Sequence, residues 1–409
     1  MAAGVLQAVT LGYQLLWNAQ RQVAGVALSV DPCPGHTVDV AHLVNALGQL
    51  WGPHSPTLLL RTPSPTLLAG LLDHTPKTLA RVEVSSGMLS DAALAQRVRN
   101  AQPRGLQLVW RGEPGERPLP AVAGCFAQTI VSFTPEEALL ALHASLRKTT
   151  RPETITGSPA SSPARAHQIF DGIASRALAG HCLDEQGAAA LLGWPTEDVL
   201  YSHRQTHLHP GRHALLNLVR AIDADASMDD IERRLGEEPL LAYRFLRYTN
   251  SAGLGLNREI DALRQGLMVL GLARTKTWLR EQLPHASIDP NLQPVRQAMV
   301  LRARFMAELL DAGEGDALKR ELYLCGLLSQ VDVLLGEPMG SALHAVPLPG
   351  RVKEAILAQY GPYWPYLDIA TSTEAALPDV TRATCAQHGF DLEDVNTALL
   401  RTLARLGAV

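Results

Sequence analysis

Short apolar runs alternate with helix-length stretches over about the first 148 residues. Runs typical of buried strands occur at residues 13–17, 23–30, 58–61, 80–84, 106–110 and 129–133. Between them, apolar residues recur at helical spacing in the stretches 40–50, 66–72, 89–100 and 135–147. Strands separated by helix-length crossovers form right-handed βαβ units. The pattern therefore predicts a parallel sheet or a partial barrel in this half of the chain.

The segment that follows has a different composition. Residues 149–163 contain three prolines among Ser, Thr and Gly, which is typical of a linker. An Ala-rich stretch up to Leu192 has helical spacing, and a histidine-rich stretch continues to Gly211. We therefore expect residues 149–211 to form a Pro/Ser linker and a helical connector.

From about Arg212 onward, apolar stripes at helical spacing replace the strand pattern. Ser227, with Asp230 three residues later, is typical of a helix N-terminus, where such side chains pair with free backbone N–H groups. Two longer amphipathic stretches, 292–310 and 318–335, predict a packed antiparallel pair. The sequence thus predicts two domains, α/β over residues 1–148 and all-helical over residues 212–409.

Composition narrows the function classes. Hydrophobic residues make up 46% of the 409, which is enough to bury a core in each domain. The formal charge of −4 gives no reason to expect nucleic acid or a membrane surface as a partner. The five cysteines are scattered without a Cys-x-x-Cys pair, which favours a reducing compartment. Because no segment approaches the roughly 20 apolar residues of a membrane span, we expect a soluble, cytoplasmic protein without a cofactor.

One part of the helical half carries a specific resemblance. Residues 240–252, Leu-Leu-Ala-Tyr-Arg-Phe-Leu-Arg-Tyr-Thr-Asn-Ser-Ala, resemble the signature helix of HDOD domains, which ends in an Asn-Ser pair, here Asn250 and Ser251. Residues 260–271 resemble the next helix of that family. Residues 325–330, Cys-Gly-Leu-Leu-Ser-Gln, resemble a segment shared with HD-superfamily phosphohydrolases. The resemblance implies a helical bacterial signalling domain over roughly residues 212–370.

The ligand doublet of those hydrolases is replaced in this chain. HD-superfamily hydrolases need a His-Asp doublet with another His and Asp, because imidazoles and carboxylates together hold the metals that activate water. Here Ser329 and Gln330 stand at the doublet, and no histidine occurs between His285 and His344. A hydroxyl and a neutral amide are poor replacements for such ligands. We therefore expect no metal centre and no hydrolysis in this domain.

An α/β half before an HDOD half is similar to a bacterial family whose first domain is of the EAL, cyclic di-GMP phosphodiesterase type. That family carries Glu-Ala-Leu on its second strand, and Val26 stands at the position of the acid here. Glu83 matches another family carboxylate, but Trp110 and Arg111 occupy the place of the paired aspartates. An arginine there would repel a divalent cation. The resemblance implies a degenerate, partial EAL-type β/α barrel without a metal centre.

Several further residues have both a structural and a functional interpretation. Asn250 and Ser251 can cap a helix or contact a ligand. An aromatic cluster that includes Tyr363 and Trp364 can pack under a loop or form a recognition patch for a partner. Two other sets are either surface residues or binding residues. The first could bind a metal and consists of His203, His207, His209 and His213. The second could bind a nucleotide and consists of Arg302, Arg304 and Arg320.

Together, these residues predict a bacterial regulatory protein that is not an enzyme and acts through protein–protein contacts of its HDOD domain. The replaced ligands in both halves carry this prediction. The alternative is a cyclic di-GMP sensor whose EAL-like half binds the dinucleotide without cleaving it. A metallohydrolase with unconventional ligands is a third alternative. The sequence does not identify the protein partner.

Overall fold

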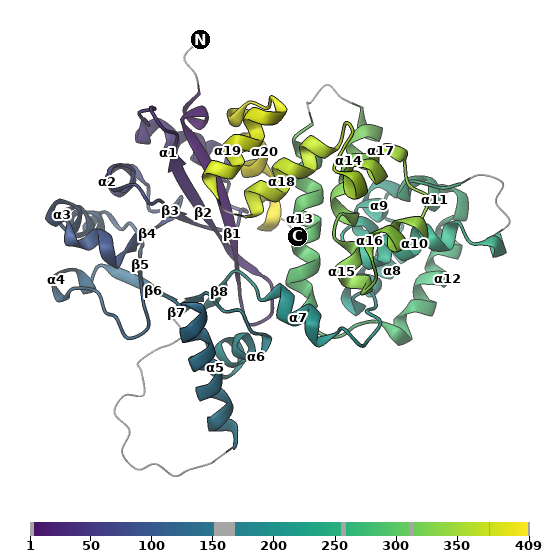
Figure 1. The fold of residues 1–409 in the computed structure, drawn as a ribbon, viewed down its shortest axis with the longest axis horizontal. Helices are drawn as coiled ribbons and strands as arrows, with labels where there is room; N and C mark the ends of the chain where they lie inside the picture. The colour runs from purple at the N-terminus through teal and green to yellow at the C-terminus, as the bar shows by residue number, and fades with distance from the viewer. Residues whose placement is uncertain (1–3, 151–167, 255–258, 311–314, 376, 408–409) are drawn as a thin grey trace. The chain divides into compact units, whose positions relative to one another are not determined.

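The structure, a computed structural model, describes residues 4–150, 168–254, 259–310, 315–375 and 377–407. The chain divides into two compact units (Figure 1). Met1–Asp198 and Ser372–Val409 form the first, which we call the barrel unit, and Val199–Thr371 form the second, the helical unit. Within the described residues, no helix is both long and apolar enough to cross a membrane.

Eight strands close into a barrel in the barrel unit. They are β1 (Val9–Trp17), β2 (Val23–Pro32), β3 (Thr57–Arg61), β4 (Arg81–Ser85), β5 (Leu108–Gly112), β6 (Phe126–Ser132), β7 (Gln168–Asp171) and β8 (Ala190–Leu192). β1 runs antiparallel to both of its neighbours, β2 and β8, while β2 to β8 pair in parallel. The carboxyl ends of β2 to β8 therefore all lie at the same end of the barrel.

Helices connect the parallel strands. They are α1 (Val40–Leu50), α2 (Pro65–His74), α3 (Ala92–Ala101), α4 (Pro120–Ala123), α5 (Pro135–Thr150) and α6 (Arg176–Gly180). Three of them begin where a short polar side chain accepts from a free backbone N–H, because Asp39, Ser64 and Asp91 cap α1, α2 and α3. Their apolar sides pack on the outward faces of the strands, as the βαβ pattern predicts.

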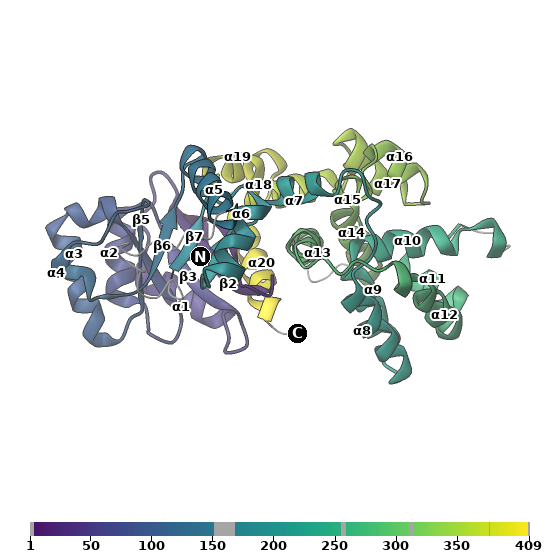
Figure 2. The same ribbon diagram turned by 90° about the horizontal axis from the view of Figure 1, so that it is seen from below.

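The helical unit is built from consecutive helices (Figure 2). They are α7 (Thr196–Ser202, which starts in the barrel unit), α8 (Arg212–Asp223), α9 (Met228–Gly236), α10 (Pro239–Thr249), α11 (Leu263–Leu270), α12 (Leu272–Gln282), α13 (Leu292–Glu308), α14 (Asp316–Leu328), α15 (Val331–Leu335), α16 (Met339–His344), α17 (Gly350–Lys353) and α18 (Trp364–Glu374, which ends in the barrel unit). Ser227 caps α9 by accepting from Asp230 N, as predicted. α13 and α14 pack closely, since a Cβ on Gly326 would lie 2.7 Å from Ala303 Cα.

A buried ion pair fixes the chain at the start of this unit. Glu238 caps α10 by accepting from Leu241 N at 2.6 Å, and its other oxygen accepts from Gly211 N at 3.2 Å. Arg296 of α13 places Nε 2.9 Å from the same carboxylate and donates Nη2 to His209 O at 2.8 Å. Both side chains are less than 6% exposed. The pair therefore joins α10, α13 and the chain before α8 into one core.

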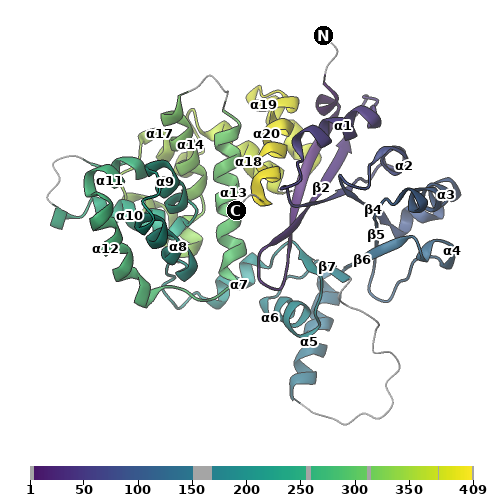
Figure 3. The same cartoon turned by 180° about the vertical axis from the view of Figure 1, so that it is seen from behind.

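The last two helices, α19 (Pro378–His388) and α20 (Leu392–Ala404), belong to the barrel unit and lie beside β1 (Figures 1 and 3). Asn396 of α20 is buried, accepts from Leu11 N at 3.2 Å and donates to Leu6 O and Val9 O, both at 2.8 Å. These three backbone groups belong to β1 and to the turn before it. A single side chain thus attaches the end of the chain to its first strand.

The fold class is confirmed, with an α/β barrel followed by helices, but the barrel is closed and not partial. The observed division also differs from the predicted boundaries at 148 and 212. β7 and β8 lie inside the segment predicted as linker and helical connector, and Ser372–Val409 leave the helical half for the barrel unit. β7 has four residues and β8 has three. Beside Ala-rich sequence, strands this short do not show the two-residue alternation that marks a strand. Most of the predicted linker, residues 151–163, lies outside the described residues.

The attachment of α20 to β1 can be tested by substitution. Asn396→Ala leaves three interior backbone groups without partners, and each such group costs about 1–3 kcal/mol. We expect it to lower the unfolding free energy of the barrel unit by about 3 kcal/mol, measured by urea unfolding with tryptophan fluorescence. Thr397→Ala on the same helix is the control and should change little. An unchanged unfolding midpoint in Asn396→Ala would contradict the attachment.

Candidate functional site

The barrel interior is filled by one apolar layer. Its members come from seven of the eight strands and form a single buried cluster: Leu16, Ala27, Leu59, Val109, Ile130, Ile169, Ala190 and Leu192. Side chains alternate between the two faces of a strand, so residues two positions away from these also point inward. The paired registers agree, since Ala27 lies opposite Leu59 and Ile130 opposite Ile169.

Above this layer, at the carboxyl ends of the parallel strands, the inward positions are polar. We call them the mouth residues: Gln14, Ser29, Arg61, Glu83, Arg111, Ser132 and Asp171. Glu83 is 9% exposed and buried, while the other six are half-buried. In β/α barrels, this end carries the functional site, because loops from every strand converge there. The mouth is therefore the candidate site of the barrel unit.

Arg111 is at the centre of one network in the mouth. Its Nε lies 2.5 Å from Glu83 Oε1, and its Nη1 lies 2.6 Å from Asp171 Oδ2. The same Nη1 donates to Ser132 Oγ at 2.5 Å. Burial by itself would lower the pKa of Arg111, but the charges of Glu83 and Asp171 and their hydrogen bonds outweigh burial and raise it. One guanidinium thus bridges two carboxylates from strands on both sides of β5.

Arg61 is at the centre of the second network and has only neutral partners. Its Nε donates to Ser29 Oγ at 2.5 Å and its Nη1 to Gln14 Oε1 at 2.7 Å. Among the described residues, no carboxylate lies within ion-pair distance of it. Burial lowers the pKa of Arg61 and the charge of Arg111 lowers it further, while the charges of Glu83, Asp171 and Asp31 offset this only in part. Arg61 is therefore a cation that an incoming anion would stabilise.

The structure places only part of the predicted N-terminal site in the mouth. Arg111 and Glu83 face inward, but Val26 and Trp110 point outward toward the helices, because Ala27 and Val109 are their inward neighbours. The mouth position on β2 is Ser29. Sequence reasoning missed Arg61 and Asp171, although a charged residue at the end of an apolar run is a signal that could have found them. Arg111, which stands where the resemblance places the paired aspartates, does lie between two carboxylates, those of Glu83 and Asp171.

The mouth does not fit a divalent cation in this arrangement. Glu83 and Asp171 are its carboxylates, and both are paired with Arg111. Across the described ranges, no group of three or more His, Cys, Asp or Glu side chains is arranged to hold a metal ion. What the mouth offers is two guanidiniums, two hydroxyls and an amide, which are groups that bind phosphate or carboxylate oxygens.

In the helical unit, the replaced doublet lies between α14 and α15. Ser329 Oγ donates to Gly326 O at 2.8 Å and accepts from Arg302 Nη1 at 2.9 Å, and Gln330 is the residue before α15. Arg302 is buried, whereas Arg304 pairs with Glu237 at 2.7 Å. The arginines predicted as one possible nucleotide-binding face therefore point to different partners.

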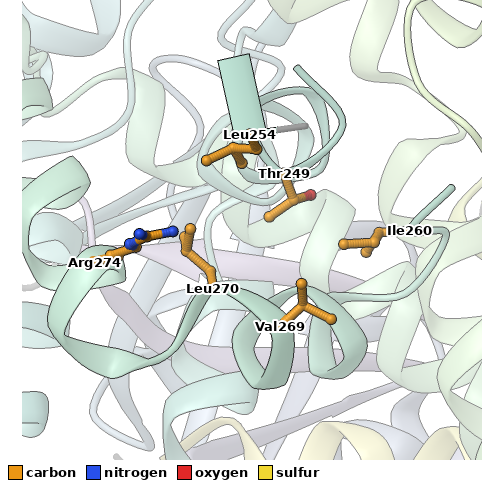
Figure 4. A pocket seen from close by; sticks show the side chains of 6 residues that line it. All are labelled: Thr249, Leu254, Ile260, Val269, Leu270 and Arg274. Carbon is orange, nitrogen blue, oxygen red and sulfur yellow. The ribbon is translucent and has the colours of Figure 1, made fainter. Parts of the chain in front are cut away.

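A small pocket opens on this unit beside α11 (Figure 4). Its lining residues are Thr249, Leu254, Ile260, Val269, Leu270 and Arg274. Asn250 fixes one wall, because its amide donates to Ile260 O and accepts from Ile260 N, both at 2.8 Å. Ser251 beside it is exposed. The Asn of the HDOD signature thus holds the chain that returns toward α11, which agrees with its structural interpretation.

The other candidate residues have local partners. Tyr363 is 3% exposed and donates to Glu321 at 2.9 Å, while Trp364 is half-buried. Burial, with that hydrogen bond, raises the pKa of Tyr363.

Two of the candidate histidines have side-chain partners. His203 lies 2.9 Å from Asp289, and His209 accepts from Arg244 at 3.0 Å. Burial and the Arg244 charge lower the pKa of His209, which keeps this imidazole neutral. The two histidine contacts describe packing around the start of the helical unit.

Comparisons with known proteins agree with the sequence motifs. A family model described as the HDOD domain matches residues 212–337. The cyclic di-GMP phosphodiesterase CdgJ of Vibrio cholerae is 26% identical over 200 residues, which cover 48% of this chain and 46% of the relative. The chain thus matches about half the length of this curated relative.

Two solved structures show weaker similarity. The MmoQ response regulator of Methylococcus capsulatus matches with a TM-score of 0.39 and 16% identity, over 47% of this chain and 97% of that one. The Klebsiella pneumoniae BlrP1 complex with calcium and cyclic di-GMP matches with a TM-score of 0.30 and 11% identity, over 48% of this chain and 57% of that one.

One prediction from the sequence is contradicted, namely that the chain is not an enzyme. The curated relative carries the name of a phosphodiesterase, so replaced ligands are no ground for excluding catalysis. The HDOD prediction is confirmed, because the family model matches residues 212–337, which contain the motifs at 240–252, 260–271 and 325–330. Residues 212–337 of this chain therefore form an HDOD domain, which follows an eight-stranded closed barrel.

Proposed function

We propose that this chain acts in cyclic di-GMP signalling, with the barrel mouth binding the dinucleotide and the HDOD domain contacting a protein partner. The observation that carries the proposal is Arg61, a half-buried guanidinium whose hydrogen bonds within the described part of the chain go to Ser29 and Gln14. Cyclic di-GMP has two phosphodiester groups, each with one negative charge. A phosphate at Arg61 would give this guanidinium a charged hydrogen-bond partner in addition to its neutral ones. The free cysteines support a reducing, cytoplasmic location.

Arg111 would act differently in this site. Its guanidinium already bridges Glu83 and Asp171, so its first task is to offset part of the negative charge of two inward carboxylates that would otherwise repel the ligand. Ser132 and Ser29 add hydroxyl groups on either side, and both can turn toward a phosphate oxygen. In the mouth, Arg61 is then the guanidinium that, among the described residues, has no carboxylate within ion-pair distance.

Hydrolysis of the bound dinucleotide is a second candidate function, favoured by the name of the Vibrio cholerae relative. Of the mouth residues, Glu83 and Asp171 are the carboxylates, which are the groups that could act as a general base or orient a water molecule. Both would have to leave Arg111 in part to do so. The geometry supports binding directly, whereas hydrolysis needs this rearrangement as well.

For the HDOD domain, we propose contact with a partner segment that combines an apolar side chain with a carboxylate. Val269 of α11 lines the pocket in Figure 4 and is 50% exposed, and its chain neighbour Met268 is 60% exposed. Arg274, also exposed, lies at the edge of that pocket. An apolar hollow beside an exposed guanidinium matches an apolar residue next to an acidic one.

Calorimetric titration with cyclic di-GMP tests the binding role. We expect Arg61→Gln to weaken binding by about tenfold or more, because a charge-assisted hydrogen bond to phosphate contributes about 1.5–3 kcal/mol. Arg81→Gln is the matched control, since Arg81 also donates to an amide, that of Gln128, but at the other end of the barrel. Equal affinities of wild type and Arg61→Gln, or no binding by the wild type, would contradict the binding role.

Chromatography of the reaction products tests the second candidate. If the mouth hydrolyses the dinucleotide, wild-type protein with Mg²⁺ or Mn²⁺ converts it to a linear product, and Glu83→Gln slows this at least about tenfold by removing an acid–base group. Glu136→Gln, at an exposed position on α5, is the control. A wild type that forms no product refutes this candidate, and an unchanged rate in Glu83→Gln places the reaction elsewhere.

The partner contact is tested by comparing variants in affinity purification from the host. Val269→Glu puts an acidic group at the pocket and should remove a protein that the wild type retains. Ile288→Glu makes the same change at another exposed apolar position, 79% exposed, and should retain it. The assignment to α11 is refuted if Val269→Glu retains every protein that the wild type retains, or if both variants lose the same one.

A further inference from the structure

The segment after the HDOD domain reaches the barrel mouth. Arg382 of α19 donates Nη1 to Thr10 Oγ1 on β1 at 2.9 Å. Thr10 is 1% exposed and lies opposite Asp31 of β2 in the strand register. On β1, the positions of Thr10 and Gln14 share the inward face. Arg382 therefore lies on the wall of the barrel where the mouth residues Gln14 and Ser29 stand.

Arg382 and Arg61 both act electrostatically on one carboxylate of this wall, that of Asp31. Burial raises the pKa of Asp31, and the charges of Arg382 and Arg61 act on it in the opposite direction. Both guanidiniums are thus close enough to the Asp31 carboxylate to influence it. The other partner of Arg382 is Asp379 on the same helix, whose side chain is 92% exposed. An ion pair so exposed is screened by water and restrains Arg382 little.

We propose that Arg382 is a ligand-binding residue of the barrel mouth, so that α19 and α20 complete a site for a phosphate-bearing anion whose floor is formed by the strands. The proposal rests on the proposed function, because it concerns the same ligand. Arg61 binds one phosphate from the strand side, and Arg382 reaches a second one from the helix side. Since Thr10 holds Arg382 through a neutral hydroxyl, the guanidinium keeps donors for an anion.

The barrel unit is made of two chain segments, one before and one after the helical unit. The chain leaves the barrel unit at Asp198, forms the helical unit and returns at Ser372. A ligand that bridges Arg61 and Arg382 therefore joins strands that precede the HDOD domain to a helix that follows it. Asn396 already attaches α20 to β1, so the ligand would tighten a contact that exists without it. Binding at the mouth would stabilise both ends of the HDOD domain against local opening.

The test compares the wild type with four variants in calorimetric titrations with cyclic di-GMP. Arg382→Gln should weaken binding about tenfold, and Arg382→Lys, which keeps the charge, only about threefold. Asp379→Asn removes the exposed partner alone and should bind like the wild type. Arg99→Gln makes the same charge change on α3, where Arg99 donates only to Gln96 among the described residues, and serves as a further control.

A second readout separates ligand contact from a structural role. On addition of cyclic di-GMP, hydrogen exchange of residues 378–388 should slow in the wild type and stay unchanged in Arg382→Gln. If the wild type binds but Arg382→Gln binds equally well, this inference is overturned while the proposed function stands.

If cyclic di-GMP does not bind, inorganic pyrophosphate is the probe. Pyrophosphate binding that is lost in Arg382→Gln would support the anion site and refute only the choice of ligand. Pyrophosphate binding that Arg382→Gln retains, or binding of neither probe, would overturn both proposals.

Discussion

The barrel unit depends on the guanidinium of Arg111, which holds two carboxylates together inside the barrel. Glu83 and Asp171 point inward from β4 and β7, and two unpaired charges there would destabilise the closed barrel. Arg111 bridges them from β5 and also holds Ser132 of β6. Four consecutive strands are thus joined by side chains as well as by their backbone ladders. Arg61 lies beside this set and, among the described residues, makes its hydrogen bonds to neutral side chains.

The two units use buried polar groups in the same way. In the helical unit, Glu238 and Arg296 join α10, α13 and the chain before α8. In the barrel unit, Asn396 fixes α20 to β1 through three backbone hydrogen bonds. Each of these side chains joins segments that are distant in sequence. Apolar packing alone would fix the arrangement of these segments less specifically. The position of α19, and with it Arg382, follows from the Asn396 contacts.

The helical domain could be predicted from its sequence, because amphipathic periods and caps are local features. Ser227 predicts the start of α9, and residues 240–252 carry a signature that the family comparison confirms. The boundary near residue 371 could not be predicted, since α19 and α20 have the same helical period as the helices before them. Contacts between segments far apart in the sequence, such as those of Asn396 and Arg382 with β1, assign these helices to the barrel unit.

The mouth could be predicted only in part, for a physical reason. Parallel strands are buried on both faces and read as continuous apolar runs, so the sequence does not show which residues point inward. Val26 and Glu83 look equivalent as strand residues, yet Val26 faces the helices and Glu83 the interior. Asp171 lies on a strand of four residues that has no readable period. Whether each of these side chains faces the interior or the helices depends on closure of the barrel. Closure in turn depends on pairing between strands that are distant in sequence.

The most direct test of a ligand site in the mouth is a crystal structure of the protein with cyclic di-GMP. The account predicts a phosphate oxygen of the dinucleotide within hydrogen-bond distance of the Arg61 guanidinium, with Arg111 still between Glu83 and Asp171. A dinucleotide bound elsewhere on the chain, with Arg61 still bonded only to Ser29 and Gln14, would contradict it.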